Sequence, residues 1–196
     1  MKTTCEIYNL QIVKCKLVDY LYFMERSNGM RPQDVVVLLK IILLKDQPWM
    51  KKDLAHELFI SPAEIGHSLN RSQLAGLLDD KKVLKKSFIE FLIHGFPYVF
   101  PVRPGGVTIG MPTAHSAPVL NQFIVSTEMV VWPCPDGKKR GYAITPLYKG
   151  AVDASLRDRQ LYDLLSLCDV LRIGKLREKQ KARELIERSF GRAVVK

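Results

Sequence analysis

The side chains of this chain that are best suited to chemistry lie in one short stretch, residues 61–71. The amide of Asn70 can pair with adenine, the guanidinium of Arg71 can donate to guanine or to a phosphate, and the imidazole of His67 can contact either group. This chemistry predicts a surface that reads DNA. The other residues expected in it are small residues that allow close approach and polar residues placed for phosphates: Lys51, Lys52, Ser61, Ala63 and Gly66.

Two short helices joined by a tight turn would present these side chains. The apolar pattern predicts one helix over residues 51–59 and a second over residues 62–74. Ser61 is a favourable N-cap, Pro62 suits the first helical position, and Glu64 completes a capping box. The expected inward face of the second helix is Ile65, Ser68, Leu69 and Ser72, and the expected outward face is Ala63, Gly66, His67, Asn70 and Arg71. In the alternative interpretation, the pair is a helical hairpin whose polar face only meets water.

The same stretch carries the motif of a known family. Its leucine-alanine helix, its isoleucine-serine turn and its alanine-glycine-leucine ending are formed by Trp49, Asp53-Leu54-Ala55-His56-Glu57-Leu58, Ile60-Ser61-Pro62, Ile65, Leu69-Asn70-Arg71 and Ala75-Gly76-Leu77-Leu78. Over about residues 31–78, roughly a quarter of the chain, this pattern resembles bacterial winged helix-turn-helix regulators of the MarR-like type. The resemblance implies a homodimer that represses or activates transcription at a palindromic operator, often held together by terminal helices.

Three features depart from the family pattern. Phe59 occupies a turn position that most often holds glycine, and Ser72 stands where a core leucine is usual. Residues 79–87 lead into a helix instead of a plain wing hairpin. A wing is therefore expected further along the chain, where residues 98–102 and 141–144 are predicted to pair as strands. The candidate basic residues of such a wing are Arg103 and the run Lys138-Lys139-Arg140.

The chain is basic. Its 196 residues include 30 Lys and Arg against 20 Asp and Glu, a formal net charge of +10. Such an excess favours polyanionic partners, nucleic acid first and an anionic membrane surface second. Residues 172–196 alone carry nine positive and three negative side chains, a net charge of +6. This tail is either a second phosphate-contacting surface or a solvated helix face.

Neither a metal site, a cofactor site nor a catalytic centre is expected. The four cysteines are scattered without a CxxC pair, and the four histidines show no metal-ligand spacing. The glycine-rich segment 105–118 lacks the Gly-Lys-Ser/Thr ending of a phosphate loop and does not lead into a helix. His115 and Ser116 lack a nucleophile elbow and a partnered acid. The segment is expected to be a structured loop packed over the helical domain, with a small-molecule or partner site as the alternative.

Unpaired cysteines and the lack of a secretory pattern indicate a cytoplasmic protein. The apolar run 35–44 is too short to span a bilayer and contains a lysine, so it is expected to be a buried helix. The expected fold is mainly α with a small β component. Its four segments are an N-terminal helix near 9–26 that could serve as a dimerisation arm (1–30), a winged helix-turn-helix domain (31–102), a loop-rich β segment (103–150) and basic C-terminal helices near 158–172 and 175–190 (151–196).

Together these patterns predict a sequence-specific regulator that binds double-stranded DNA as a homodimer and needs no cofactor. The alternative is a protein-interaction adaptor or an antitoxin-like module that uses the same helical scaffold to dock a protein partner. Indifference to DNA and co-purification with a neighbouring gene product would favour the alternative.

Overall fold

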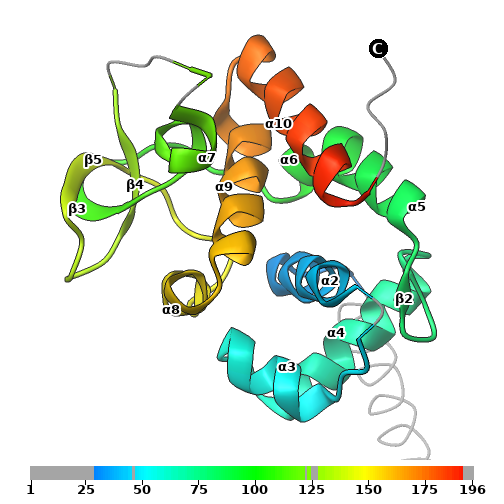
Figure 1. The fold of residues 1–196 in the computed structure, drawn as a ribbon. Coiled ribbons are helices and arrows are strands. Elements are labelled where there is room, and N and C mark those ends of the chain that lie inside the picture. Colours follow the sequence, from blue (N-terminus) through cyan, green and yellow to red (C-terminus); the bar gives the residue numbers. More distant parts are fainter. Residues whose placement is uncertain (1–28, 46, 122, 125–127, 192–196) are drawn as a thin grey trace, which may run out of the picture. The chain divides into compact units, whose positions relative to one another are not determined.

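The computed structural model of the protein describes residues 29–45, 47–121, 123–124 and 128–191. The chain divides into two compact units, residues 1–30 and 31–196. The helix expected near residues 9–26 lies outside the described residues. The described part is mainly helical with a small β component (Figure 1), as the sequence patterns predict.

Helix α2 (Pro32–Leu44) is the buried helix expected from the apolar run. Its residues Val35 to Leu39 are completely shielded from solvent. Lys40, inside this run, is 7% exposed, and its ammonium pairs with the carboxylates of Glu57 and Asp158. Burial alone would lower the pKa of Lys40, but the hydrogen bonds and charges of these two carboxylates outweigh it and raise the pKa. The apolar helix therefore carries its one lysine as a compensated charge.

Helices α3 (Lys51–Leu58) and α4 (Pro62–Leu74) form the predicted helix pair. Ser61 caps α4, because its Oγ accepts a hydrogen bond of 3.2 Å from the backbone N–H three residues on. Phe59 ends α3 in a left-handed conformation with φ of 54° and ψ of 38°. Its ring lies under the guanidinium of Arg157, 4.2 Å from ring centre to Cζ. Phe59 thus takes the backbone conformation of the usual glycine and packs its side chain locally.

A short hairpin follows α4, where the sequence pattern predicts none. Strand β1 (Leu78–Asp79) pairs antiparallel with β2 (Lys82–Val83). Asp80 in the turn has a φ of 49°, a conformation that aspartate tolerates better than most residues. The expectation that residues 79–87 lead into a helix without a hairpin is therefore wrong.

After the hairpin the chain is helical as far as residue 99. Helix α5 (Lys85–Glu90) continues through a π-helical turn η1 (Phe91–Gly95) into α6 (Phe96–Val99). The predicted strand at residues 98–102 is therefore wrong. Phe96 is completely buried, and its ring makes edge contacts with two neighbouring phenylalanine rings. This aromatic packing joins rings along the helical stretch from η1 to the end of α6 and overrides the strand preference of the Tyr-Val-Phe run.

The loop-rich segment contains a small closed barrel of three strands: β3 (Val107–Pro112), β4 (Val130–Pro133) and β5 (Lys139–Ala143). β3 is antiparallel to the other two strands, which are parallel to each other. The predicted strand at 141–144 is confirmed as β5, but its partners are β3 and β4. Closure needs glycine at two positions, since a Cβ at Gly110 or Gly141 would collide with the backbone of Trp132 or Met129.

Three helices complete the fold: α8 (Ala151–Arg157), α9 (Arg159–Ile173) and α10 (Leu176–Ser189). The last two confirm the predicted C-terminal pair. α9 contacts α2, α6, α10 and the 3₁₀ turn η2 (Ala114–Ser116) beside the short helix α7 (Pro118–Asn121), so it lies at the centre of the unit (Figure 1). Within the described ranges, no helix combines the length and apolar character needed to cross a membrane.

A buried carboxylate joins the barrel to α9. Asp169, fully buried, accepts hydrogen bonds from Thr113 Oγ1 at 2.8 Å and from Trp132 Nε1 at 2.6 Å, and it pairs with Arg172 at 2.8 Å. Burial raises the pKa of Asp169, and its three donors oppose that shift. The polar groups at this junction satisfy one another and leave nothing directed at solvent.

Candidate nucleic-acid interface

The outward face of α4 is polar and open to solvent. His67, Asn70 and Ala63 are exposed and Gly66 is half-buried, while Ile65 and Leu69 are buried on the opposite face. These positions confirm the inward and outward faces predicted for α4 with one exception. Ala63 and Gly66 have little or no side chain, so the longer polar side chains of α4 project beyond them. Close approach to base edges requires such a surface.

Arg71 is that exception, and the expectation that it points outward is wrong. Its guanidinium is 6% exposed and forms a two-pronged contact with the buried carboxylate of Asp34, at 2.8 Å from Nε and 2.6 Å from Nη2. Nη2 also lies 2.6 Å from Glu64 Oε1. The hydrogen bond to Asp34 raises the pKa of Arg71 against the effect of burial. Arg71 thus fastens α4 to the start of α2 and is not available to a base.

The same contact changes the role expected for Glu64. In a full capping box its carboxylate would return to the backbone of Ser61. Instead it accepts from Arg71 and, at 3.1 Å, from Gln33 Nε2 on α2. Burial would raise the pKa of Glu64, but the hydrogen bond and charge of Arg71 outweigh it and lower the pKa. Only the serine half of the predicted capping box is confirmed.

Lys51 and Lys52 stand at the start of α3, both exposed. A methyl group placed on Gly66 would lie 3.8 Å from Nζ of Lys51, so this ammonium reaches over the middle of α4. Ser61, also exposed, lies at the N-terminus of α4, where the helix dipole favours an anion. Its Oγ already accepts the capping bond, so only its O–H remains for a phosphate.

The β1–β2 hairpin contributes residues that sequence reasoning missed. Lys81 and Lys82 are exposed in it, and Nζ of Lys81 lies 5.6 Å from the ring centre of Trp49. A groove of about 330 Å³, here the α4–hairpin groove, separates the hairpin from α4. It is lined by Trp49, Met50, Lys51, Leu69, Asn70, Gln73, Asp80 and Lys81.

A sequence feature could have revealed this hairpin. Two apolar pairs, Leu77-Leu78 and Val83-Leu84, flank the four polar residues Asp79-Asp80-Lys81-Lys82. That arrangement is typical of two very short strands around a turn. The strands hold two residues each, too few to show an alternating pattern.

The lysines around α4 carry uncompensated charge. Among the described residues no carboxylate forms an ion pair with Lys51, Lys52, Lys81 or Lys82. The carboxylates of the helix pair are engaged elsewhere: Glu57 with Lys40, Glu64 with Arg71, and Asp53 with the backbone N–H of Met50 at 3.2 Å. Asp79 and Asp80 lie exposed in the hairpin beside Lys81 and Lys82. The surface keeps a net positive charge, because the four lysines outnumber the two hairpin aspartates and the acids of the helix pair are engaged elsewhere.

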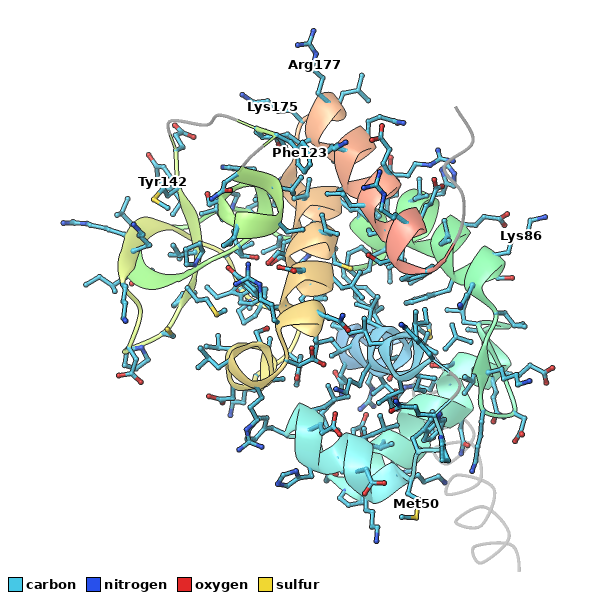
Figure 2. The ribbon with its side chains drawn as sticks, viewed as in Figure 1. Met50, Lys86, Phe123, Tyr142, Lys175 and Arg177 are labelled. Carbon is cyan, nitrogen blue, oxygen red and sulfur yellow. The ribbon has the colours of Figure 1, made fainter. Side chains whose placement is uncertain are left out.

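Arg103 lies at the far end of the same unit. Its neighbours Val102 and Pro104 line a pocket with Ile173 and Lys175, at the C-terminal end of α9. The N-terminal end of α9 meets α2 through Asp158, and 15 helical residues span about 22 Å. Figure 2 shows Lys175 far from Met50, which precedes α3. The structure does not bring Arg103 together with the other predicted site residues.

Comparison of the chain with protein-family models, with curated proteins and with solved structures finds no match. The resemblance to MarR-like regulators therefore depends on the residues of α3, α4 and the turn between them. A function for the chain has to be inferred from its exposed groups.

His115 and Ser116 of the glycine-rich loop have a structural role. His115 Nε2 lies 2.9 Å from the carbonyl oxygen of Glu128, and Ser116 Oγ accepts from the backbone N–H of Val130 at 2.9 Å. Both side chains thus hold η2 against the strand β4. Across the described ranges, no group of three His, Cys, Asp or Glu side chains is arranged to hold a metal ion.

Proposed function

We propose that α2 to α6, with the β1–β2 hairpin as a short wing, form a winged helix-turn-helix module. It binds double-stranded DNA as a homodimeric transcriptional regulator. In this proposal α4 enters the major groove, where His67, Asn70 and Gln73 meet base edges. Lys51 and Lys52 on one side, and Lys81 and Lys82 on the other, contact the phosphates that border the groove.

One observation carries this proposal: the exposed polar face of α4 has lysines without carboxylate partners on both sides. A solvated helix face is usually balanced by acids of opposite charge, whereas a surface for DNA needs a positive border around a polar centre. The order of the elements adds support, because two helices joined by a turn are followed directly by a hairpin.

The experiment compares two pairs of exposed lysines, one in the hairpin and one at the barrel. Lys81 and Lys82 are both changed to Gln in one variant, and Lys138 and Lys139, at the barrel, are both changed in the other. Binding to a mixed-sequence 30-base-pair duplex is followed by fluorescence anisotropy over a range of salt. We expect the slope of log K against log salt to become shallower by about 0.9 for each phosphate that the protein no longer neutralises. The hairpin pair should show this change and the barrel pair should not.

Base reading is tested separately through Asn70. A duplex is first selected from a random pool by repeated binding to the native protein. Asn70→Ala should then weaken binding to the selected duplex by about 1–3 kcal/mol and leave binding to a scrambled duplex almost unchanged. Equal weakening on both duplexes would remove the base-reading role.

A protein-docking adaptor is the second candidate, and exposed apolar side chains favour it. Tyr98 on α6 and Leu176 on α10 are 82% and 87% exposed. They border a hollow of about 330 Å³ between these helices. Large exposed apolar groups are typical of surfaces that another protein covers. Failure of the native protein to bind any duplex, with retention of a protein partner through this hollow, would favour the adaptor.

A further inference from the structure

A second hollow shares the hairpin lysines Lys81 and Lys82 with the surface around α4. Four lysines surround a hollow of about 370 Å³ formed by the end of α2, the hairpin, the start of α5 and the end of α10. We call it the lysine hollow. Its lining residues are Ile41, Ile42, Lys45, Lys81, Lys82, Val83, Lys85, Ser189, Phe190 and Gly191, and none of them is acidic.

The charges in the lysine hollow are largely uncommitted. Lys85 donates to the carbonyl oxygen of Phe190 at 3.1 Å, which satisfies one carbonyl at the end of α10. Lys81 also lies near the ring of Trp49. Within the described ranges, neither Lys45 nor Lys82 forms an ion pair with a carboxylate. Four ammonium groups around one hollow repel each other unless an anion lies between them.

The backbone of Lys45 is a second, independent observation at this hollow. It has a φ of 56° and a ψ of −124°, a conformation that glycine adopts easily and lysine rarely does. The lysine side chain is therefore held at the rim of the hollow in spite of a strained backbone, which is typical of functional positions.

We propose that the lysine hollow binds phosphate groups, and that in the DNA complex proposed above these are backbone phosphates beyond the segment contacted by α4. The apolar floor of Ile41, Ile42 and Val83 offers no hydrogen-bond partner, so the four ammonium groups supply the recognition. Ammonium groups bind phosphate as point charges and do not require a planar partner. The assignment to DNA backbone phosphates rests on the proposed function, whereas phosphate binding in the lysine hollow does not.

The test uses the full chain with Lys45→Gly, Lys85→Gln and, as the control, Lys86→Gln. Lys86 is adjacent to Lys85 in sequence, does not line the hollow, and projects from α5 into solvent (Figure 2). Lys45→Gly should leave the midpoint of thermal unfolding unchanged or raise it, because glycine relieves the backbone strain. With this variant, weaker binding of the ligand cannot be attributed to impaired folding.

Two binding probes distinguish the source of the phosphate. On a 30-base-pair duplex, each hollow variant should flatten the slope of log K against log salt by about 0.9, while Lys86→Gln leaves it unchanged. Calorimetric titration with pyrophosphate in the absence of DNA tests for a free phosphate compound. Binding of pyrophosphate that Lys45→Gly abolishes would support the hollow even if the native protein binds no duplex. Three results together would overturn phosphate binding in the lysine hollow: the native protein binds the duplex, both hollow variants show the same salt slope as Lys86→Gln, and pyrophosphate does not bind. The proposed function would then still stand.

Discussion

The two ends of the 31–196 unit each contain a buried arginine–aspartate pair, but their surroundings differ. At the helix-pair end, Arg71 joins Asp34 beneath a surface of exposed lysines. At the barrel end, Arg172 joins Asp169, and the remaining donors come from the side chains of Thr113 and Trp132. The barrel end also exposes Lys138, Lys139 and Arg140, but these lie together on one turn and strand, whereas the helix-pair end has exposed lysines on both sides of the polar face of α4. This difference is why we place the ligand at the helix-pair end.

The two ends also differ in which basic residues remain available to a ligand. Both buried arginines serve the fold, since Arg172 also donates from Nε to the carbonyl oxygen of Phe100 at 2.8 Å. The groups that remain for a polyanion at the helix-pair end are lysines on helix starts and on the hairpin. An arginine fork is thus used where geometry must be fixed, and lysines are left where a flexible partner is contacted.

The largest expected effect comes from removing Asp34. Asp34→Ala leaves the Arg71 guanidinium buried without its main partner, which should lower the free energy of unfolding by about 3–5 kcal/mol. Urea denaturation followed by circular dichroism measures this change. If Arg71→Ala instead leaves stability unchanged and abolishes only DNA binding, the structural role assigned to Arg71 is wrong.

Asp169→Asn should have a smaller effect at the barrel end. The amide oxygen can still accept from Thr113 and Trp132, but the oxygen that accepts from Arg172 Nη1 is replaced by an NH2 donor. We expect a decrease of about 1.5–3 kcal/mol in the free energy of unfolding, the range for hydrogen bonds to charged groups. The fluorescence of Trp132 should also change, since its indole N–H donates to this carboxylate. An effect as large as that of Asp34→Ala would remove the contrast between the two ends.

The two ends should respond to acid with opposite signs. The pKa of Glu64 is lowered in the fold, so its contribution to stability is present above the ordinary value of 4.5 and is lost as the pH falls through the folded pKa. The pKa of Asp169 is raised, so its contribution is present below 3.8 and declines as the pH rises through the folded pKa. The free energy of unfolding is measured against pH for both variants. Glu64→Gln should lack the loss of stability at low pH, and Asp169→Asn should lack the decline as the pH rises.

The smallest effect compares two serines. Ser72 on α4 is completely buried, and its hydroxyl has no hydrogen-bond partner among the described residues. Ser72→Ala should raise the free energy of unfolding by about 1 kcal/mol, because an unsatisfied hydroxyl is removed and alanine favours the helix. Ser116→Ala, which deletes the acceptor for the Val130 N–H, should lower it by about 0.5–1.5 kcal/mol. Thermal or urea denaturation of the two variants side by side checks the signs, and a decrease of stability in Ser72→Ala would contradict the first.

The helix-pair end was the more predictable of the two ends. The helix over 62–74, its serine cap and its buried face at Ile65 and Leu69 all follow from residues within one or two helical turns. The presence of Lys40 in the apolar run also follows from the sequence, whereas its partners Glu57 and Asp158 do not. Capping and periodicity act over a few residues, so they can be recognised without knowing the rest of the fold.

Contacts between distant residues could not be predicted in the same way. Arg71 sits at the edge of the helical face, and its burial depends on Asp34, 37 residues earlier in the chain. The barrel pairs residues 107–110 with residues 139–142, and no local pattern specifies that register. The run at 98–102 has strand preferences, yet aromatic packing around Phe96 makes its first part helical.

The sequence by itself determined the positions of α2, α3, α4, α9 and α10, the positive charge and most of the polar outward face of α4, because each depends on neighbouring residues or on composition. Only the tertiary structure decided which basic side chains are free, where the hairpin lies and how the lysine hollow forms. A charge is free or compensated according to what lies within a few ångströms of it, and those neighbours come from parts of the chain that only folding brings together.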